Sequence, residues 1–138
     1  MAKSPTNHGP LEGCWCDSQV PATQCCLPFL EFRTDAPTAE ALMRSRYSAY
    51  VTQNKDYLLA TWYPATAPKT LEFVPEQNWL GLKIVALQQG GEEDNQGTVE
   101  FVARSKTHGQ GHRLHEISHF EKIAGRWFYV GGEILKKR

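Results

Sequence analysis

The order of polar and apolar residues divides the chain into a helical part followed by a part made of strands. When residues 38–54 are set at helical steps of about 100°, one apolar stripe collects Ala39, Leu42, Met43, Ala49 and Tyr50. Thr38 precedes this stripe and is suited to cap the first turn. On the same projection Arg44 and Ser48 point away from the stripe. A second helical stretch, 56–63, is stopped by Pro64.

From residue 79 onward the hydrophobic period falls to two, which is typical of strands. The strand-like runs are 79–87, 98–104, 113–123 and 127–134. Glycine-rich stretches separate the first three runs, and the short turn 124–126 before the last one suits a hairpin. Helices followed by hairpin-linked strands predict an α+β fold, with N-terminal helices packed in a curved antiparallel sheet.

The N-terminal part of the chain shows neither the helical period nor the strand period of two. Residues 1–13 carry Pro5, Gly9 and Pro10 and no apolar rhythm, so we expect a flexible N-terminus. Residues 14–28 contain all the cysteines and would need a metal to organise them. The remaining residues, 29–138, have the length of one ordinary domain.

Composition excludes several classes of partner. The 15 Lys and Arg residues balance the 15 Asp and Glu residues, so no nucleic acid partner is expected. No apolar run approaches the roughly 18 to 20 residues that span a bilayer, and the start lacks a signal-peptide pattern. We therefore expect no membrane association and a cytoplasmic location, in which thiols stay reduced. The basic tail 136–138 is interpreted as a solvated terminus.

The cysteine spacing predicts a metal centre. Two close pairs, separated by eight residues, comprise Cys14, Cys16, Cys25 and Cys26. Zinc prefers four ligands in a tetrahedron and binds thiolates well, and a reversing loop lets two pairs converge on one ion. We predict one structural zinc per chain. The alternatives are two local disulfides, four unrelated small apolar residues, or a site in which His8 replaces one thiolate.

The spacing Cys-x-Cys-x8-Cys-Cys resembles the SEC-C zinc motif. The rest of the chain resembles the uncharacterised YchJ family, in segments 42–51, 57–62, 79–82, 99–104, 115–120 and 125–132. This resemblance implies a cone-shaped domain like those of nuclear transport factor 2 and ketosteroid isomerase, preceded by a zinc knuckle at 14–28. The loop 17–24 departs from the usual SEC-C pattern because it has no Gly-Ser-Gly and no lysine. The chaperone and ribosome partners of SEC-C knuckles are therefore not carried over.

Arg46 lies inside the apolar stripe and needs a partner, because burying an unpaired guanidinium is costly. Strand alternation places Glu116 on the same face as Leu114 and Phe120, where it could meet the helix. Two alternatives stay open: a structural ion pair, or an arginine that presents donors to a ligand in the mouth of the cone. The candidate cavity residues are Arg46, Tyr47, Tyr50, Trp62, His115 and Glu116.

Two hypotheses of function follow. The first is a non-catalytic binding or adaptor module with a structural zinc knuckle, which contacts a protein partner through the knuckle or a small ligand through the cone. A homodimer through the sheet face is a further expectation. The second is an isomerase or dehydratase that uses Glu116, His115 or His119 as its base. No residue is assigned a catalytic role.

Overall fold

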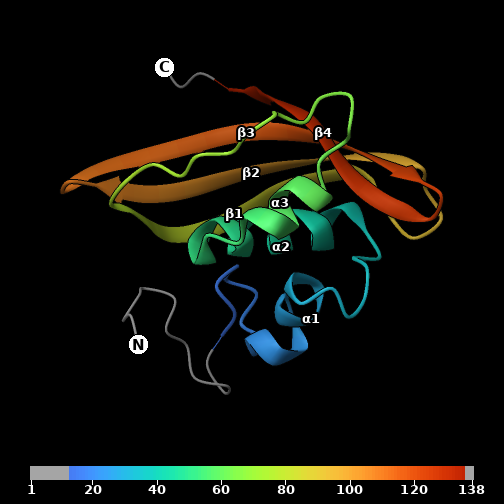
Figure 1. The fold of residues 1–138 in the computed structure, drawn as a ribbon, viewed down its shortest axis with the longest axis horizontal. Coiled ribbons are helices and arrows are strands. Elements are labelled where there is room, and N and C mark those ends of the chain that lie inside the picture. The colour runs from blue at the N-terminus through green and yellow to red at the C-terminus, as the bar shows by residue number, and fades with distance from the viewer. Residues whose placement is uncertain (1–12, 136–138) are drawn as a thin grey trace.

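The computed structural model describes residues 13–135, and its helices precede its strands. Figure 1 shows a curved sheet on one side of the long helix, with the cysteine segment and the first helix on the other side. The helical elements are η1 (Ala22–Gln24), α1 (Leu27–Leu30), α2 (Ala39–Thr52) and α3 (Lys55–Ala60). No helix among these residues has the length and apolar character needed to cross a membrane.

The sheet contains four antiparallel strands in the order β1-β2-β3-β4, so each strand pairs with its neighbour in sequence. The strands are β1 (Gln77–Gln89), β2 (Gln96–Thr107), β3 (Gln110–Ile123) and β4 (Arg126–Ile134). The tight turn before β4 places Ala124 and Gly125 at φ 53° and 82°, as a two-residue hairpin requires. The predicted α+β class and the hairpin are confirmed.

Helix α2 begins and ends where its sequence indicates. Thr38 accepts a hydrogen bond from the Ala41 amide at 3.0 Å, which confirms the predicted N-cap. Gln53 ends the helix in the left-handed region at φ 58°. Ser48, which the sequence places away from the apolar stripe, is fully buried and faces the Cys14 sulfur. The cysteine segment covers this side, so α2 packs on two faces.

The cysteine segment contains two short helical turns that the sequence pattern did not predict. Elements η1 and α1 span only three and four residues. A single turn carries no measurable hydrophobic period, and so short a helix depends on its surroundings for stability. Its stability here comes from the buried side chains of Cys26 and Leu30, which join the core.

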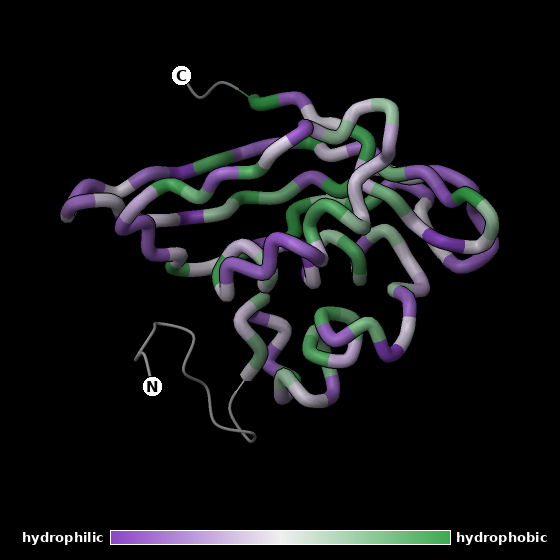
Figure 2. The backbone as a smooth tube through the Cα atoms, in the orientation of Figure 1, coloured by the Kyte–Doolittle hydropathy of each residue, from purple (hydrophilic) through white to green (hydrophobic). Residues whose placement is uncertain are grey.

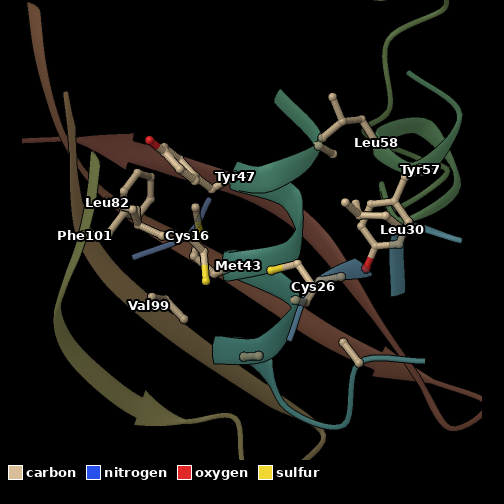
Figure 3. Close-up of a cluster of buried hydrophobic side chains, with 14 of the residues drawn as sticks. Cys16, Cys26, Leu30, Met43, Tyr47, Tyr57, Leu58, Leu82, Val99 and Phe101 are labelled. Carbon is tan, nitrogen blue, oxygen red and sulfur yellow. The ribbon is translucent and has the colours of Figure 1, made fainter. Parts of the chain in front are cut away.

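The core lies between the sheet and the helices and extends into the cysteine segment. The hydropathy colouring in Figure 2 shows apolar stretches on the helices and on the strands that cover them, and a polar tip on the hairpin of β2 and β3. Phe120 and Val99 from the sheet are as fully buried as Leu58 from α3. In Figure 3 the sulfurs of Cys16 and Cys26 lie beside α2 among these side chains. Cysteine segment and sheet domain therefore share one core.

Candidate metal centre and adjoining cavity

The four cysteines converge because the chain between them reverses tightly. An isolated bridge pairs Gly13 with Pro21, and the Cys14 amide donates to the Val20 carbonyl at 2.7 Å. Asp17 and Gln19 take positive φ values of 64° and 73° in this turn. The chain thereby brings the first cysteine pair back against the second.

The four Sγ atoms lie within 4.8 Å of one another. The Cys16 and Cys25 sulfurs are 3.6 Å apart, and those of Cys25 and Cys26 are 3.9 Å apart. Zinc–sulfur bonds of about 2.3 Å in a tetrahedron require sulfurs about 3.8 Å apart. The observed spacing therefore fits one tetrahedral divalent ion held by four thiolates. No disulfide joins the four cysteines, and His8 lies outside the described residues.

The thiols influence one another strongly. Contacts with the Cys16 sulfur lower the pKa of Cys14, whereas contacts with the Cys14 sulfur raise the pKa of Cys26. Once one thiol has lost its proton, its neighbours hold theirs more tightly, so the sulfurs titrate as a set. A divalent cation removes this conflict, because it lets all the sulfurs be thiolates together.

Polar groups from α2 surround the sulfurs. Arg44 donates from Nη1 to the Cys16 carbonyl at 3.0 Å and to the Cys16 sulfur at 3.7 Å. Its Nε donates to Glu40, which fixes the guanidinium against the helix. The hydroxyl of Ser48 lies 3.8 Å from the Cys14 sulfur. Donors beside coordinating sulfurs offset the negative charge of a four-thiolate centre.

A cavity of about 270 Å³ lies between α2 and the sheet. Its apolar wall consists of Met43, Trp79, Phe101, Ala103 and Leu114. Its polar groups belong to Arg46, Tyr47, Tyr50, Glu116, Ser118 and Tyr129. Arg44 and Arg46 are two positions apart on α2, about 200° around the helix axis. One helix therefore supplies residues to the metal centre from one face and to the cavity from the other.

Arg46 is 4% exposed and finds its partners in neutral groups. Its Nη1 donates to the Leu58 carbonyl at 2.8 Å and to the Thr61 hydroxyl at 2.7 Å. The guanidinium carbon lies 4.8 Å from the ring centre of Trp62 and 4.5 Å from that of Tyr129. Burial lowers the pKa of Arg46 to about 10, so the side chain remains charged at neutral pH.

Glu116 lines the same cavity from β3. Its Oε2 accepts from the Ser118 hydroxyl at 2.9 Å and from the Tyr129 hydroxyl at 3.5 Å. Among the described residues, no ion pair joins Glu116 to Arg46. Of the two alternatives left open by the sequence, the structural ion pair is therefore not formed. Both charges border the cavity instead.

The other candidate cavity residues lie in the cavity wall, behind Arg46, or on the opposite face of the sheet. Tyr47 and Tyr50 line the cavity with Arg46 and Glu116. Trp62 is not among the lining residues, and its ring packs on the guanidinium of Arg46. His115 points away from the cavity, because neighbouring residues of a strand face opposite sides. It pairs there with Glu100 at 2.7 Å.

The histidine bases considered for catalysis lie outside the cavity. His119 is half-exposed and lies 4.0 Å from Glu133. The tyrosines that line the cavity stay protonated at neutral pH, since burial raises the pKa of Tyr50 and raises that of Tyr129 to about 12. Among the described lining residues, Glu116 is therefore the remaining candidate for a base, as the one that carries a carboxylate.

Sequence reasoning missed two functional positions. Arg44 was placed away from the apolar stripe and given no role, and its donor contact with Cys16 depends on how the cysteine segment docks. Tyr129 was not among the candidate cavity residues, yet it contacts both charged groups of the cavity. Strand alternation places Phe120 on the same face as Glu116, and Tyr129 pairs with Phe120 across the last hairpin. This pairing could have indicated that Tyr129 faces the cavity.

Fold and site together define a class: a small α+β protein with a cone-like sheet, a lined cavity and a four-cysteine centre at its N-terminal end. A family model described as the YchJ middle NTF2-like domain matches residues 38–132. The chain belongs to this YchJ-like family, and its relatives include UPF0225 proteins. The family resemblance noted from the sequence is confirmed.

Relatives and solved structures agree with this assignment. The UPF0225 protein of Chromobacterium violaceum is 48% identical over 78% of this chain and 83% of its own length. The UPF0225 protein of Bordetella pertussis is 45% identical over 97% of this chain and 99% of its own length.

Two SEC-C motif proteins share the fold. The solution structure from Rhodopseudomonas palustris has a TM-score of 0.79 and 34% identity, and covers 90% of this chain and 99% of its own. The crystal structure from Psychrobacter arcticus has a TM-score of 0.70 and 26% identity, and covers 100% of this chain and 85% of its own. Two solved proteins named for a SEC-C motif therefore share the fold of this chain.

Proposed function

We propose that this protein is a non-catalytic binding module, in which a structural zinc ion braces the N-terminal knuckle and the cavity of the cone binds a small ligand. The observation that carries the proposal is the pair of opposite charges on the cavity wall, Arg46 and Glu116, which do not pair with each other. A purely structural pair would be expected to close on itself, since separated buried charges are costly. A ligand that contacts both would offset that cost.

Burial and spacing of the sulfurs support zinc in a structural role. Cys14, Cys16 and Cys26 are at most 2% exposed, and a closed four-thiolate site leaves no coordination position for a substrate. Metal analysis of protein purified without chelators should give about one zinc per chain. Cys26→Ser should lose the metal and the order of the knuckle, seen as collapsed amide shifts of residues 14–28 in an NMR spectrum. Metal-free protein with an ordered knuckle would overturn this part.

The ligand-binding part can be tested by filling the cavity. Ala103 lines it and is 3% exposed, so Ala103→Leu places a larger apolar side chain inside. The matched control is Ala86→Leu, on the exposed part of β1. Benzyl alcohol, a small neutral probe, should raise the melting temperature of the wild type and of the control but not that of Ala103→Leu. Equal shifts in all three proteins would place binding elsewhere.

In the same proposal the outer surface of the knuckle contacts a protein partner. Its exposed residues past the first cysteine pair are uncharged apart from Asp17, and they include Gln19, Val20, Thr23 and Gln24. Association through such a surface should depend weakly on ionic strength. Salt-sensitive binding would instead indicate a charged face elsewhere on the molecule.

A second candidate function rests on Glu116. A carboxylate beside the Tyr129 hydroxyl in a largely apolar cavity is an arrangement that can remove a proton next to a carbonyl group. The test is deuterium exchange of a small ketone, cyclohexanone, in D₂O. Exchange that is accelerated by the wild type and abolished in Glu116→Gln would establish an isomerase-like activity. Equal rates for the two proteins would leave the binding module as the function.

A further inference from the structure

The cavity carries two charges of opposite sign. Among its lining residues Arg46 and Glu116 are the charged ones, so the formal charge of the wall is zero. A ligand with a single charge would be attracted by one of these groups and repelled by the other. A ligand with one positive and one negative group meets both favourably.

Arg46 lacks an anionic partner in the described part of the chain. Its hydrogen bonds reach a backbone carbonyl and the Thr61 hydroxyl, and all of them leave from Nη1. The rings of Trp62 and Tyr129 pack against the guanidinium next to each other, with their centres 5.2 Å apart, and hold it in place. The group is therefore held in place while its charge stays available to a carboxylate that enters the cavity.

Glu116 is held in a comparable way. Ser118 and Tyr129 both donate to Oε2, and none of the described cationic groups lies within ion-pair distance. Its side chain also lies against Gly132 of β4, where a Cβ atom would come within 2.7 Å of the carboxyl carbon. The carboxylate is thus seated in a position that requires a glycine opposite, and it can accept from an ammonium group.

Tyr129 contacts both charged groups. Its ring face contacts the guanidinium of Arg46, and its hydroxyl donates to Glu116. The two charges are therefore linked through one side chain without pairing directly, and both border the same apolar space. Arg46 is buried whereas Glu116 is half-buried, so the positive group lies deeper than the negative one.

We propose that the cavity binds a small zwitterion with an apolar body, of the chemical class of α-amino acids with large apolar side chains. The ligand carboxylate pairs with Arg46, its ammonium group pairs with Glu116, and its side chain packs against the apolar wall formed by Met43, Phe101 and Leu114. This inference rests on the proposed ligand-binding function and names the ligand class for it.

Size agrees with this class. A volume of about 270 Å³ lies just below the usual range for ligand pockets of roughly 300 to 1,000 Å³, which suits one amino acid and excludes a nucleotide or a long acyl chain. The apolar wall excludes strongly hydrated bodies, because their polar groups would lose water without gaining partners.

The test is isothermal titration calorimetry at pH 7 with two matched sets of probes. The first set is L-phenylalanine, 3-phenylpropanoate and phenethylamine. The second is L-leucine, 4-methylpentanoate and 3-methylbutylamine. Each set keeps the apolar body and removes one charge at a time. In at least one set the zwitterion should bind about tenfold or more tightly than either singly charged analogue, as expected for the loss of one charged hydrogen bond.

The variant Glu116→Gln tests whether Glu116 binds the ammonium group of the ligand. The amide keeps the shape of the side chain, so the fold should be retained, and the preference for the zwitterion over the matching carboxylate should fall from about tenfold to near one. The control is Glu133→Gln, the same change at an exposed carboxylate of the neighbouring strand. It should leave the preference unchanged.

The outcomes separate this inference from the function on which it rests. A singly charged analogue that binds as tightly as the zwitterion, or a preference that survives Glu116→Gln, overturns the zwitterion class but leaves a ligand-binding cavity. If benzyl alcohol binds but none of the charged probes does, the zwitterion class is likewise overturned and the ligand-binding cavity remains. If neither the probes nor benzyl alcohol bind, the proposed binding function fails as well.

Discussion

Glu116 lies against the backbone of Gly132 on the neighbouring strand, in space that the side chain of any other residue would occupy. A Cβ atom at Gly132 would overlap Oε2 and come within 2.7 Å of the carboxyl carbon. Neither glycine of the pair 131–132 has a positive φ, so this close approach, and not backbone conformation, requires glycine at 132. The position of the cavity carboxylate therefore depends on a residue that never contacts the cavity through a side chain of its own.

Gly132→Ala should displace Glu116 from the hydroxyls of Ser118 and Tyr129. We expect a loss of about 1 kcal/mol in unfolding free energy, as for the loss of these hydrogen bonds, measured by urea denaturation. The matched control is Gly131→Ala, where a Cβ atom meets nothing within 4 Å. Equal stability of the two variants would mean that Glu116 moves aside freely.

Arg44→Met should weaken zinc binding and leave the cavity unchanged, because Arg44 is not among the residues that line the cavity. The substitution removes the donor to the Cys16 carbonyl and sulfur, and loss of such supporting contacts commonly reduces metal affinity by about 10- to 100-fold. Competition with a chromophoric chelator measures the change. Arg33→Met is the control, since Arg33 pairs with Glu31 on the surface. Unchanged affinity in Arg44→Met would show that the arginine only packs against the helix.

Asp17→Ala should loosen the knuckle from the sheet. Asp17 accepts a hydrogen bond from the Leu82 amide at 3.1 Å, on the edge strand β1. We expect a loss of about 1 kcal/mol, as for one net hydrogen bond, and faster amide exchange at Leu82. Asp17→Asn should behave like the wild type, because asparagine keeps an acceptor and tolerates the positive φ of 64°. An Asn variant as unstable as the Ala variant would assign the effect to charge.

Stability should fall at alkaline pH. Burial raises the pKa of Tyr57 and of Tyr129 to about 12, above the usual value near 10 for an unfolded chain. The unfolded state therefore loses these protons first, and the stabilisation present below about pH 10 is lost as pH rises towards 12. Arg46, whose pKa burial lowers to about 10, acts in the opposite direction over the same range, but it is one group against four, since burial also raises the pKa of Tyr47 and of Tyr50.

Tyr57→Phe isolates one of these contributions. The variant loses the 2.7 Å hydrogen bond with Ser45, at about 1 kcal/mol, and should show a shallower decline in melting temperature between pH 10 and 12. Tyr63→Phe removes a tyrosine without removing that bond and serves as the control. Identical pH profiles for both variants and the wild type would contradict the assignment to Tyr57.

Much of the fold could be predicted from local patterns. The stripe on residues 39–50 and the Thr38 cap located α2, and alternation from residue 79 located all four strands to within about three residues. The spacing of the four cysteines indicated their convergence, which the structure shows. These features depend on neighbours in sequence, so the sequence carries their full signal.

The tertiary structure decided what the patterns left open. Sequence placed Arg46 on a buried face and offered Glu116 as its partner, but the fold supplied Leu58, Thr61 and two aromatic rings instead. It also turned Ser48 inward against the cysteine segment and gave Glu116 its place over Gly132. Each of these contacts joins residues whose proximity is set by how whole elements pack, and local propensity contains no term for that packing.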